Sequence, residues 1–358
     1  MFFHFLYPLN LDISAFNVFK YITFRSIIAF ILATLISVIW GKYFINFMRK
    51  KQFGQIIRDD GPKSHFAKAG TPTMGGCVIV GSLAAAVFFC GNFHSLPVLI
   101  TIFVVTSFFG LGFLDDYLKV LKRNPKGVSA KGKLFWQVIT GLLVSFVIYK
   151  FNIVDTKIYI PFFKNALVDL GWFYIPFTTL VIVSSSNAVN LTDGLDGLAI
   201  GPIITSSISL GVMAYVAGHV ELASYLFIPY VENVGELMVL SFALIGAGIG
   251  FLWYNSYPAQ IFMGDVGSLS LGGFLGAVAV LTKNEILFVL IGGIFVIEAV
   301  SVILQVGSYK IRKKRIFKMA PIHHHFELKG WPETKVIVRF WIISACLAVI
   351  AIATLKTR

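Results

Sequence analysis

Residues 99–109, Leu99-Ile100-Thr101-Ile102-Phe103-Val104-Val105-Thr106-Ser107-Phe108-Phe109, decide the class of fold. This run is apolar on every face of a helix, whereas a strand of a membrane barrel would alternate apolar and polar residues. Across the whole chain, 57% hydrophobic residues, 13% charged residues and a mean hydropathy of +0.82 exclude a water-soluble globule. The sequence therefore predicts an all-α polytopic membrane protein.

About 20 apolar residues are needed for a helix to cross a bilayer. We expect ten transmembrane helices of roughly that length, which form a single integral membrane domain over residues 1–358. The expected spans are 21–45, 73–91, 96–114, 132–151, 172–190, 198–217, 236–253, 266–282, 286–307 and 336–355.

Basic residues are concentrated in three of the loops between these spans. The loops 46–72, 115–133 and 308–335 carry twenty of the thirty Lys and Arg. Short cytoplasmic loops carry such an excess, so these loops are expected on the cytoplasmic face, with the loops 188–197 and 254–265 beside them. An even number of spans then places both termini on the periplasmic side. Topology and anionic headgroups account for the net charge of +13, so no nucleic-acid partner is expected.

Two adjacent carboxylates, Asp115 and Asp116, follow the third expected span at the cytoplasmic boundary. Negative charge is disfavoured at a helix C-terminus, so a positive partner is expected. If the helix continues for one turn, Lys119 lies four residues after Asp115 and can pair with it. The alternative is a pair of solvated acids at the helix end.

Polar residues then recur at every third position where the fifth span ends, at Asn187, Asn190, Asp193 and Asp196. This spacing keeps the side chains on one face of a tight helical turn. Helix capping alone is the weaker interpretation, because four such residues lie in register. The spacing does not fit an EF-hand, which needs ligands at alternate positions and a terminal Glu.

Asp265 lies at the start of the glycine-rich eighth span, after a loop that contains Asn255 and Phe262. Its functional interpretation is a Mg²⁺ ligand, because Mg²⁺ prefers hard oxygen donors. The alternative is a helix N-cap, which is worth about 1 kcal/mol. Phe262 is expected either to stack on a nucleobase or to lie in the aromatic belt of the membrane.

Two further segments add polar residues. Lys68 precedes the second span and is suited to an anion near a helix N-terminus, while Thr73 can cap that helix. Glu298, Ser301 and Gln305 form a polar stripe in the ninth span, where an acid is a functional candidate or an interhelical hydrogen-bonding group. We expect Gln305 to reach the site and Glu298 to lie too deep for direct chemistry.

The stretch Ala320-Pro321-Ile322-His323-His324-His325-Phe326-Glu327 places three adjacent histidines in the most basic segment. Adjacent side chains diverge, so the three cannot all ligate one ion, and they are expected to donate to a negative diphosphate. Apart from the polar stripe of the ninth span, these polar residues fall at cytoplasmic ends of spans, whereas a transporter is expected to gather them near the midplane. An interfacial enzyme that handles phosphates with a divalent metal fits this distribution.

The chain resembles the polyprenyl-phosphate N-acetylhexosamine-1-phosphate transferases over nearly its whole length. The resemblance is carried by Gly70-Thr71-Pro72-Thr73-Met74-Gly75-Gly76, Leu114-Asp115-Asp116, the segment 187–197 and Phe262-Met263-Gly264-Asp265. The segment 319–327, with Gly330-Trp331-Pro332-Glu333, is similar to the branch that acts on a muramoyl peptide. The resemblance implies that undecaprenyl phosphate attacks the β-phosphate of UDP-MurNAc-pentapeptide and releases UMP. It also implies a requirement for Mg²⁺, a homodimer and a place in the bacterial inner membrane.

Residue roles follow from the matching motifs. The implied catalytic residues are Asp115, Asp116, Asp265 and His323, with Asp265 as the metal ligand. Asp115 is expected to remove a proton from the lipid phosphate in a single in-line displacement, and the alternative is a two-step route through a phospho-aspartate. A sister transferase for UDP-GlcNAc and a transporter remain the alternative functions. The expected substrate-binding residues are Lys68, Thr73, Lys119, Lys131, Asn187, Asn190, Asp193, Asp196, Asn255, Phe262, Gln305, His324 and His325.

Overall fold

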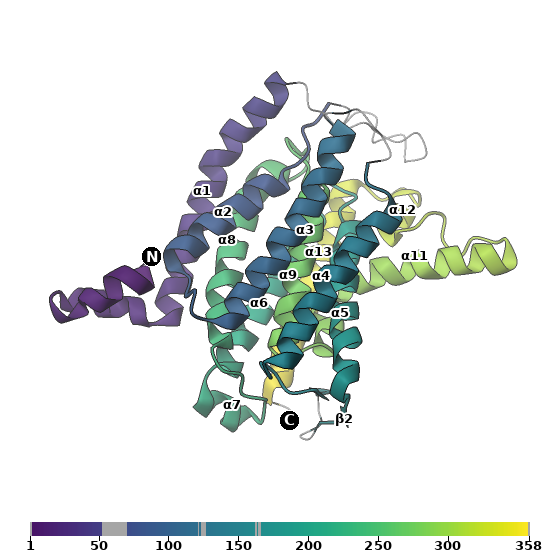
Figure 1. Cartoon of the computed structure of the whole chain (residues 1–358). Coiled ribbons are helices and arrows are strands. Elements are labelled where there is room, and N and C mark those ends of the chain that lie inside the picture. Colours follow the sequence, from purple (N-terminus) through teal and green to yellow (C-terminus); the bar gives the residue numbers. More distant parts are fainter. Residues whose placement is uncertain are drawn as a thin grey trace.

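The structure is a computed structural model, and it describes residues 2–51, 70–120, 122, 127–161, 163 and 166–356. The predicted site residue Lys68 lies outside the described residues. Within them the chain is almost entirely helical, which confirms the predicted all-α polytopic class (Figure 1).

Nine helices in the described ranges are long and apolar enough to span a membrane. The second predicted span is a shorter helix. Pro72 and Gly75 form backbone hydrogen bonds with Phe262 before α2 begins, and the N–H of Gly76, the first residue of α2, donates to the Met263 carbonyl. The spanning helices are α1 (Ile22–Lys50), α3 (Leu96–Val120), α4 (Ala130–Lys150), α5 (Tyr174–Thr192), α6 (Ile200–Ala217), α8 (Leu237–Asn255), α9 (Gly264–Leu281), α11 (Gly293–Arg312) and α13 (Glu333–Ala353), and α2 covers Gly76–Cys90.

Shorter elements connect these helices. Two strands, β1 (Lys157–Ile158) and β2 (Val168–Asp169), form an antiparallel pair between α4 and α5. The remaining elements are η1 (Phe2–Leu6), η2 (Tyr7–Leu11), η3 (Ser14–Lys20), η5 (Gly171–Phe173), α7 (Val220–Leu226), η6 (Val234–Glu236), α10 (Leu287–Ile291), α12 (Ile322–Glu327) and η7 (Thr354–Lys356).

The ninth predicted span, 286–307, is wrong as a single helix. The chain breaks at Gly292, between the short α10 and the long α11, and α11 then leaves the bundle at a steep angle (Figure 1). Sequence hydropathy could not show this break, because both segments are apolar. The change of direction turns one side of α11 outward, where Ile303 and Ile311 are exposed.

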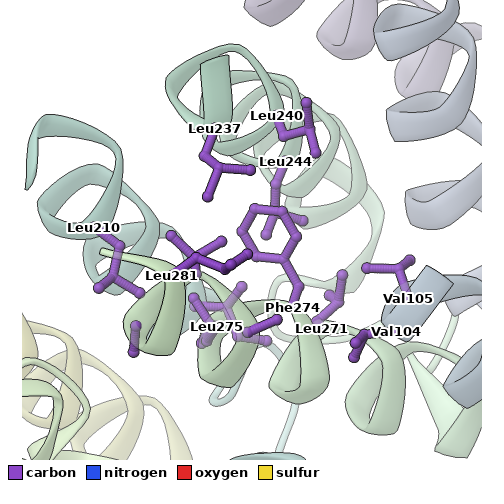
Figure 2. Packing of buried hydrophobic residues seen from close by; sticks show 14 of the residues in the cluster. Val104, Val105, Leu210, Leu237, Leu240, Leu244, Leu271, Phe274, Leu275 and Leu281 are labelled. Carbon is purple, nitrogen blue, oxygen red and sulfur yellow. The ribbon is translucent and has the colours of Figure 1, made fainter. Parts of the chain in front are cut away.

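Helix α9 forms the centre of the bundle and is almost entirely buried. It packs against α3 and α5 along much of its length, and against α2 and α6. Phe274 of α9 points toward leucines of α8 and lies near Val104 and Val105 of α3 (Figure 2). At the end of α9 where the chain enters it, a Cβ on Gly112 of α3 would lie 2.3 Å from the Asp265 carbonyl oxygen. Small residues allow such close helix packing in membranes, and here they bring the acids of α3 to Asp265.

The opposite end of the bundle carries separate buried ion pairs. Arg25 of α1 makes a bidentate pair with Glu236, with N–O distances of 2.8 and 2.7 Å. Lys283 lies 3.2 Å from Glu285, which accepts a hydrogen bond from Tyr174. Each of these charges is compensated inside the protein, so both clusters stabilise helix ends far from the acids of α3.

Candidate active site

Three carboxylates meet where α3 ends and α9 begins. Oxygen atoms of Asp115, Asp116 and Asp265 all lie within 4.8 Å of one another. Asp115 and Asp116 are buried, so the interpretation as solvated end-of-helix acids is wrong. Asp265 lies in the first turn of α9, after the cap position at Met263, and the N-cap interpretation is therefore wrong as well. Such a set of hard oxygen donors can hold a divalent cation.

Two lysines lie between these acids. Helix α3 continues past Asp116, and Lys119 pairs with Asp115 at 2.5 Å, as the i,i+4 spacing predicted. Lys133 of α4 lies 2.8 Å from Asp115 and 2.5 Å from Asp265, so it bridges acids of two other helices. The sequence analysis had placed Lys133 only among the basic loop residues. The expected site lysine, Lys131, is exposed two residues earlier on α4.

Backbone and amide groups fix the carboxylates. The Val128 N–H donates to Asp115 Oδ1 at 2.7 Å, and the Val266 N–H donates to Asp116 Oδ2 at 3.2 Å. Asn190 donates from Nδ2 to Asp265 Oδ1 at 2.9 Å and to Ser268 Oγ at 2.8 Å. The triad therefore has a defined geometry before any ligand binds.

The predicted polar face of residues 187–196 separates into different directions. Asn190 faces Asp265, whereas Asn187 donates to Gln137 of α4 at 2.9 Å and lies one turn deeper. Asp196 accepts a hydrogen bond from the Ala259 N–H at 2.9 Å and so holds the loop after α8. The helix ends at Thr192, so the three-residue period does not continue as one face.

Asp193 follows the end of α5 and faces a strongly negative region. Burial, followed by the nearby negative charges of Asp265, Asp116 and Asp196, raises the pKa of Asp193 to about 8. Its side chain is half-buried. The carboxyl is therefore mostly neutral near pH 7, and it can donate a hydrogen bond to a phosphate oxygen.

The loop 256–263 is joined to the start of α2. The Phe262 N–H donates to Pro72 O and its carbonyl accepts from Gly75, each at 2.8 Å, which brings buried Thr73 near the triad. Thr73 is not a helix cap, because the cap position of α2 is Gly75. Asn255 donates to Ile261 O at 2.8 Å, so its amide group shapes the loop.

The three histidines on α12 have three different environments. His323 is fully buried and lies 3.1 Å from Glu298 of α11. His324 Nδ1 lies 2.7 Å from Glu327, and His325 Nδ1 accepts a hydrogen bond from the Lys318 N–H at 3.0 Å. The expectation that they cannot share one ion agrees with these partners. His323 is buried in this structure, and its catalytic role stays a prediction.

The side chain of Gln305 also makes its hydrogen bonds within the protein. Its amide accepts hydrogen bonds from the Ile316 and Phe317 N–H groups and donates to Phe317 O at 3.0 Å. The side chain thereby fixes the segment between α11 and α12. The expectation that Gln305 reaches the substrate stays a prediction.

Comparison with known proteins places this geometry in a family. Residues 98–283 match the family described as Glycosyl transferase family 4, and residues 68–80 match the Phospho-N-acetylmuramoyl-pentapeptide-transferase signature 1. A phospho-N-acetylmuramoyl-pentapeptide-transferase of a Geobacter species is 55% identical over 358 residues, with both chains covered completely. This chain belongs to the phospho-N-acetylmuramoyl-pentapeptide-transferase family. Proteins of the same name from Pelobacter propionicus and Citrifermentans bemidjiense are 55% and 54% identical, again over both full lengths.

Membership of the phospho-N-acetylmuramoyl-pentapeptide-transferase family agrees with the motifs that the sequence analysis singled out. The structure brings Asp115, Asp116, Asp265, Asn190 and Lys119 together as expected. It adds Lys133 and Ser268, which no motif marked. A signal for Lys133 was present, because it lies where the basic loop 115–133 meets the fourth span, but the four other lysines of that loop shared the signal.

Proposed function

We propose that this chain transfers phospho-N-acetylmuramoyl-pentapeptide from UDP-N-acetylmuramoyl-pentapeptide to undecaprenyl phosphate, which yields lipid I and UMP. The observation that carries the proposal is the group of three acids and two lysines at one end of a membrane-spanning bundle. The full-length relatives bear the name of this transferase. A membrane acceptor can reach a site at the bilayer surface, while a nucleotide donor arrives from water.

The donor set fits a divalent cation at the triad. Its three carboxylates are hard oxygen ligands from two helices, and Asn190 and the Val266 N–H hold two of them in place. Asp265 is the proposed principal ligand for Mg²⁺, with Asp115 and Asp116 beside it. Bound there, Mg²⁺ would supply a Lewis acid that stabilises negative charge on the phosphoryl oxygens and on departing UMP.

The transfer itself is one displacement at phosphorus. An oxygen of the lipid phosphate attacks the β-phosphorus, and the bond from that phosphorus to the UMP oxygen breaks with its electron pair leaving on UMP. Lys119 and Lys133 lie where they can neutralise the charge of the two phosphates. Asp193, neutral near pH 7, is placed to donate a hydrogen bond to a diphosphate oxygen.

A proton that remains on the lipid phosphate needs an acceptor. We assign it to Asp116 in preference to the predicted Asp115. Both lysines pair with Asp115 Oδ2 and the Val128 N–H donates to its Oδ1, so both oxygens of Asp115 already have partners inside the protein. In the described part of the chain no lysine pairs with Asp116.

One assay tests the activity. Purified protein is given UDP-N-acetylmuramoyl-pentapeptide or UDP-GlcNAc, with and without undecaprenyl phosphate, and released UMP is measured. We expect UMP only from the muramoyl donor and only with the lipid. Release of UMP from UDP-GlcNAc but not from the muramoyl donor would identify the sister transferase. Translocation of a substrate with no release of UMP would identify a transporter. Exchange of UMP without lipid, together with a phosphorylated aspartate, would establish the two-step route.

The metal proposal is tested with Asp265→Asn. We expect this variant to lose Mg²⁺-dependent turnover by at least about a hundredfold, because a principal ligand and a charge are removed together. Its thermal unfolding in detergent should remain cooperative. Added Mg²⁺ should raise the unfolding temperature of the wild type and leave that of the variant unchanged. Near-wild-type turnover in this variant would contradict the assignment.

The membrane location, orientation and oligomeric state of the enzyme belong to the same proposal. We place it in the bacterial cytoplasmic membrane, with the site on the cytoplasmic face and both termini outside. The basic ends of α1 and α3 lie at the site end of the bundle, which supports this orientation (Figure 1). We propose a homodimer on the basis of the family resemblance, and crosslinking in native membranes tests it.

A further inference from the structure

Glu298 of α11 and His323 of α12 form a buried pair outside the triad. Both side chains are fully buried, and Glu298 Oε1 lies 3.1 Å from His323 Nδ1. An acid inside the membrane domain is costly unless it is paired or has a function. Glu298 does not contact the triad, so any effect of Glu298 on the site must act through His323.

The other edge of the His323 ring packs against Gly194. A Cβ built on Gly194 would lie 2.3 Å from His323 Nε2 and 2.8 Å from its Cε1, so a side chain there is excluded by the ring. Among the described residues Nε2 has no hydrogen-bond partner. A neutral ring with its hydrogen on Nδ1 donates to Glu298 and leaves no buried N–H donor unpaired, so Glu298 selects this tautomer.

Gly194 begins the turn that connects Asp193 to Asp196. Two hydrogen bonds to α13 hold this turn. The Asp196 N–H donates to Glu333 at 3.1 Å, and the Trp341 side chain donates to Gly197 O at 3.1 Å. The buried side chains of Leu195 and Leu198 join the same hydrophobic cluster as Ile294, Val336, Ile337 and Phe340. His323 is the support next to Asp193, at the end of the turn nearest the triad.

We propose that Glu298 and His323 are positioning residues for the nucleotide-sugar site. Glu298 orients the imidazole ring, and the ring fixes Gly194 so that Asp193 faces Asp265 and the diphosphate. His323 is then not a catalytic residue. This inference rests on the proposed function, because the ligand whose binding depends on the turn is the uridine diphosphate of the donor.

Substitution of Glu298 separates positioning from general damage. In Glu298→Leu the ring loses its partner, and we expect the KM for UDP-N-acetylmuramoyl-pentapeptide to rise about tenfold, while the KM for undecaprenyl phosphate stays unchanged. Glu298→Gln keeps an acceptor oxygen and should restore most of the affinity. Glu285→Gln is the matched control, since Glu285 is equally buried but lies at the other end of α9. Equal changes in both KM values for Glu298→Leu would overturn the proposal.

The ring and the glycine can be tested directly against each other. Gly194→Ala should clash with the ring and weaken UMP binding in calorimetry, and Gly194→Ala/His323→Ala should bind UMP better than Gly194→Ala alone. If His323 acted on the substrate, the double variant would be the worst of the series. Unfolding temperatures of the wild type, Gly194→Ala, His323→Ala and the double variant report the coupling without turnover. These unfolding temperatures test the contact between the His323 ring and Gly194 even if the wild type releases no UMP. Absence of UMP release would overturn only the proposed function.

Discussion

At the scale of residues, the site balances charge between neighbours that lie far apart in the sequence. Lys133 compensates two carboxylates at once, and no other group in the described chain joins α4 to both Asp115 and Asp265. Without it, acids whose oxygens lie within 4.8 Å of one another would repel. The same charge faces the place where phosphates must bind.

Lys133→Met should therefore lower kcat/KM by about a hundredfold, the usual effect of losing one charged donor at a phosphoryl site. The comparison variant is Lys131→Met, which changes an exposed lysine on the same helical turn and should lose much less. Steady-state release of UMP measures both. A larger loss in Lys131→Met would restore the sequence-based assignment and remove Lys133 from the site.

Asp193 predicts a pH dependence of stability. Its folded pKa of about 8 lies above the ordinary value of 3.8, so the folded protein keeps a proton that the unfolded chain releases. This contribution is complete below about pH 4 and is lost as pH rises through 8, which means that stability declines over that range. Without metal, the unfolding temperature should fall less between pH 6 and pH 9 in Asp193→Asn than in the wild type. Parallel declines would show that Asp193 is ionised throughout.

At the scale of elements, hydropathy predicted the order of the apolar segments, because burial in lipid imposes a simple length rule. It predicted ten spans, whereas the described residues hold nine helices of spanning length and the shorter α2. It could not predict where α11 turns away at Gly292 or that α3 continues through Asp116 to Val120. Those features depend on hydrogen bonds and ion pairs between distant segments. The acids and Asn190 could be identified because each lies in a recognisable local motif. Lys133, Ser268 and the partner of Glu298 could not, because their roles also depend on contacts between distant segments.

The contact between α3 and α9 is the element-scale determinant of the triad. At Gly112 the two backbones approach so closely that a Cβ would meet Asp265 O at 2.3 Å. Gly112→Val should separate the helices, pull Asp115 and Asp116 away from Asp265, and lower both the Mg²⁺ affinity and the unfolding temperature. Gly110→Val is the matched control, because a Cβ there meets no atom within 4 Å. Equal Mg²⁺ affinity in the two variants would show that the approach of the helices does not set the site.

At the scale of the whole molecule, the orientation in the membrane decides whether a nucleotide sugar can reach the site. The exposed Glu221 on α7 lies at the end of the bundle opposite the triad (Figure 1), and the exposed Lys314 follows α11 in a basic loop that is expected on the cytoplasmic face. The proposed topology therefore places a cysteine at 221 outside the cell and a cysteine at 314 inside it.

Labelling with a membrane-impermeant thiol reagent tests this orientation, in a background where Cys77, Cys90 and Cys346 are replaced by Ala. Intact cells should label Glu221→Cys and leave Lys314→Cys unlabelled until the membrane is opened, because the charged reagent cannot cross the bilayer. The reverse pattern would put the triad on the outer face, where UDP-linked precursors are absent, and the proposed transfer could not occur there. Retained UMP release in both variants is the control that each chain remains folded.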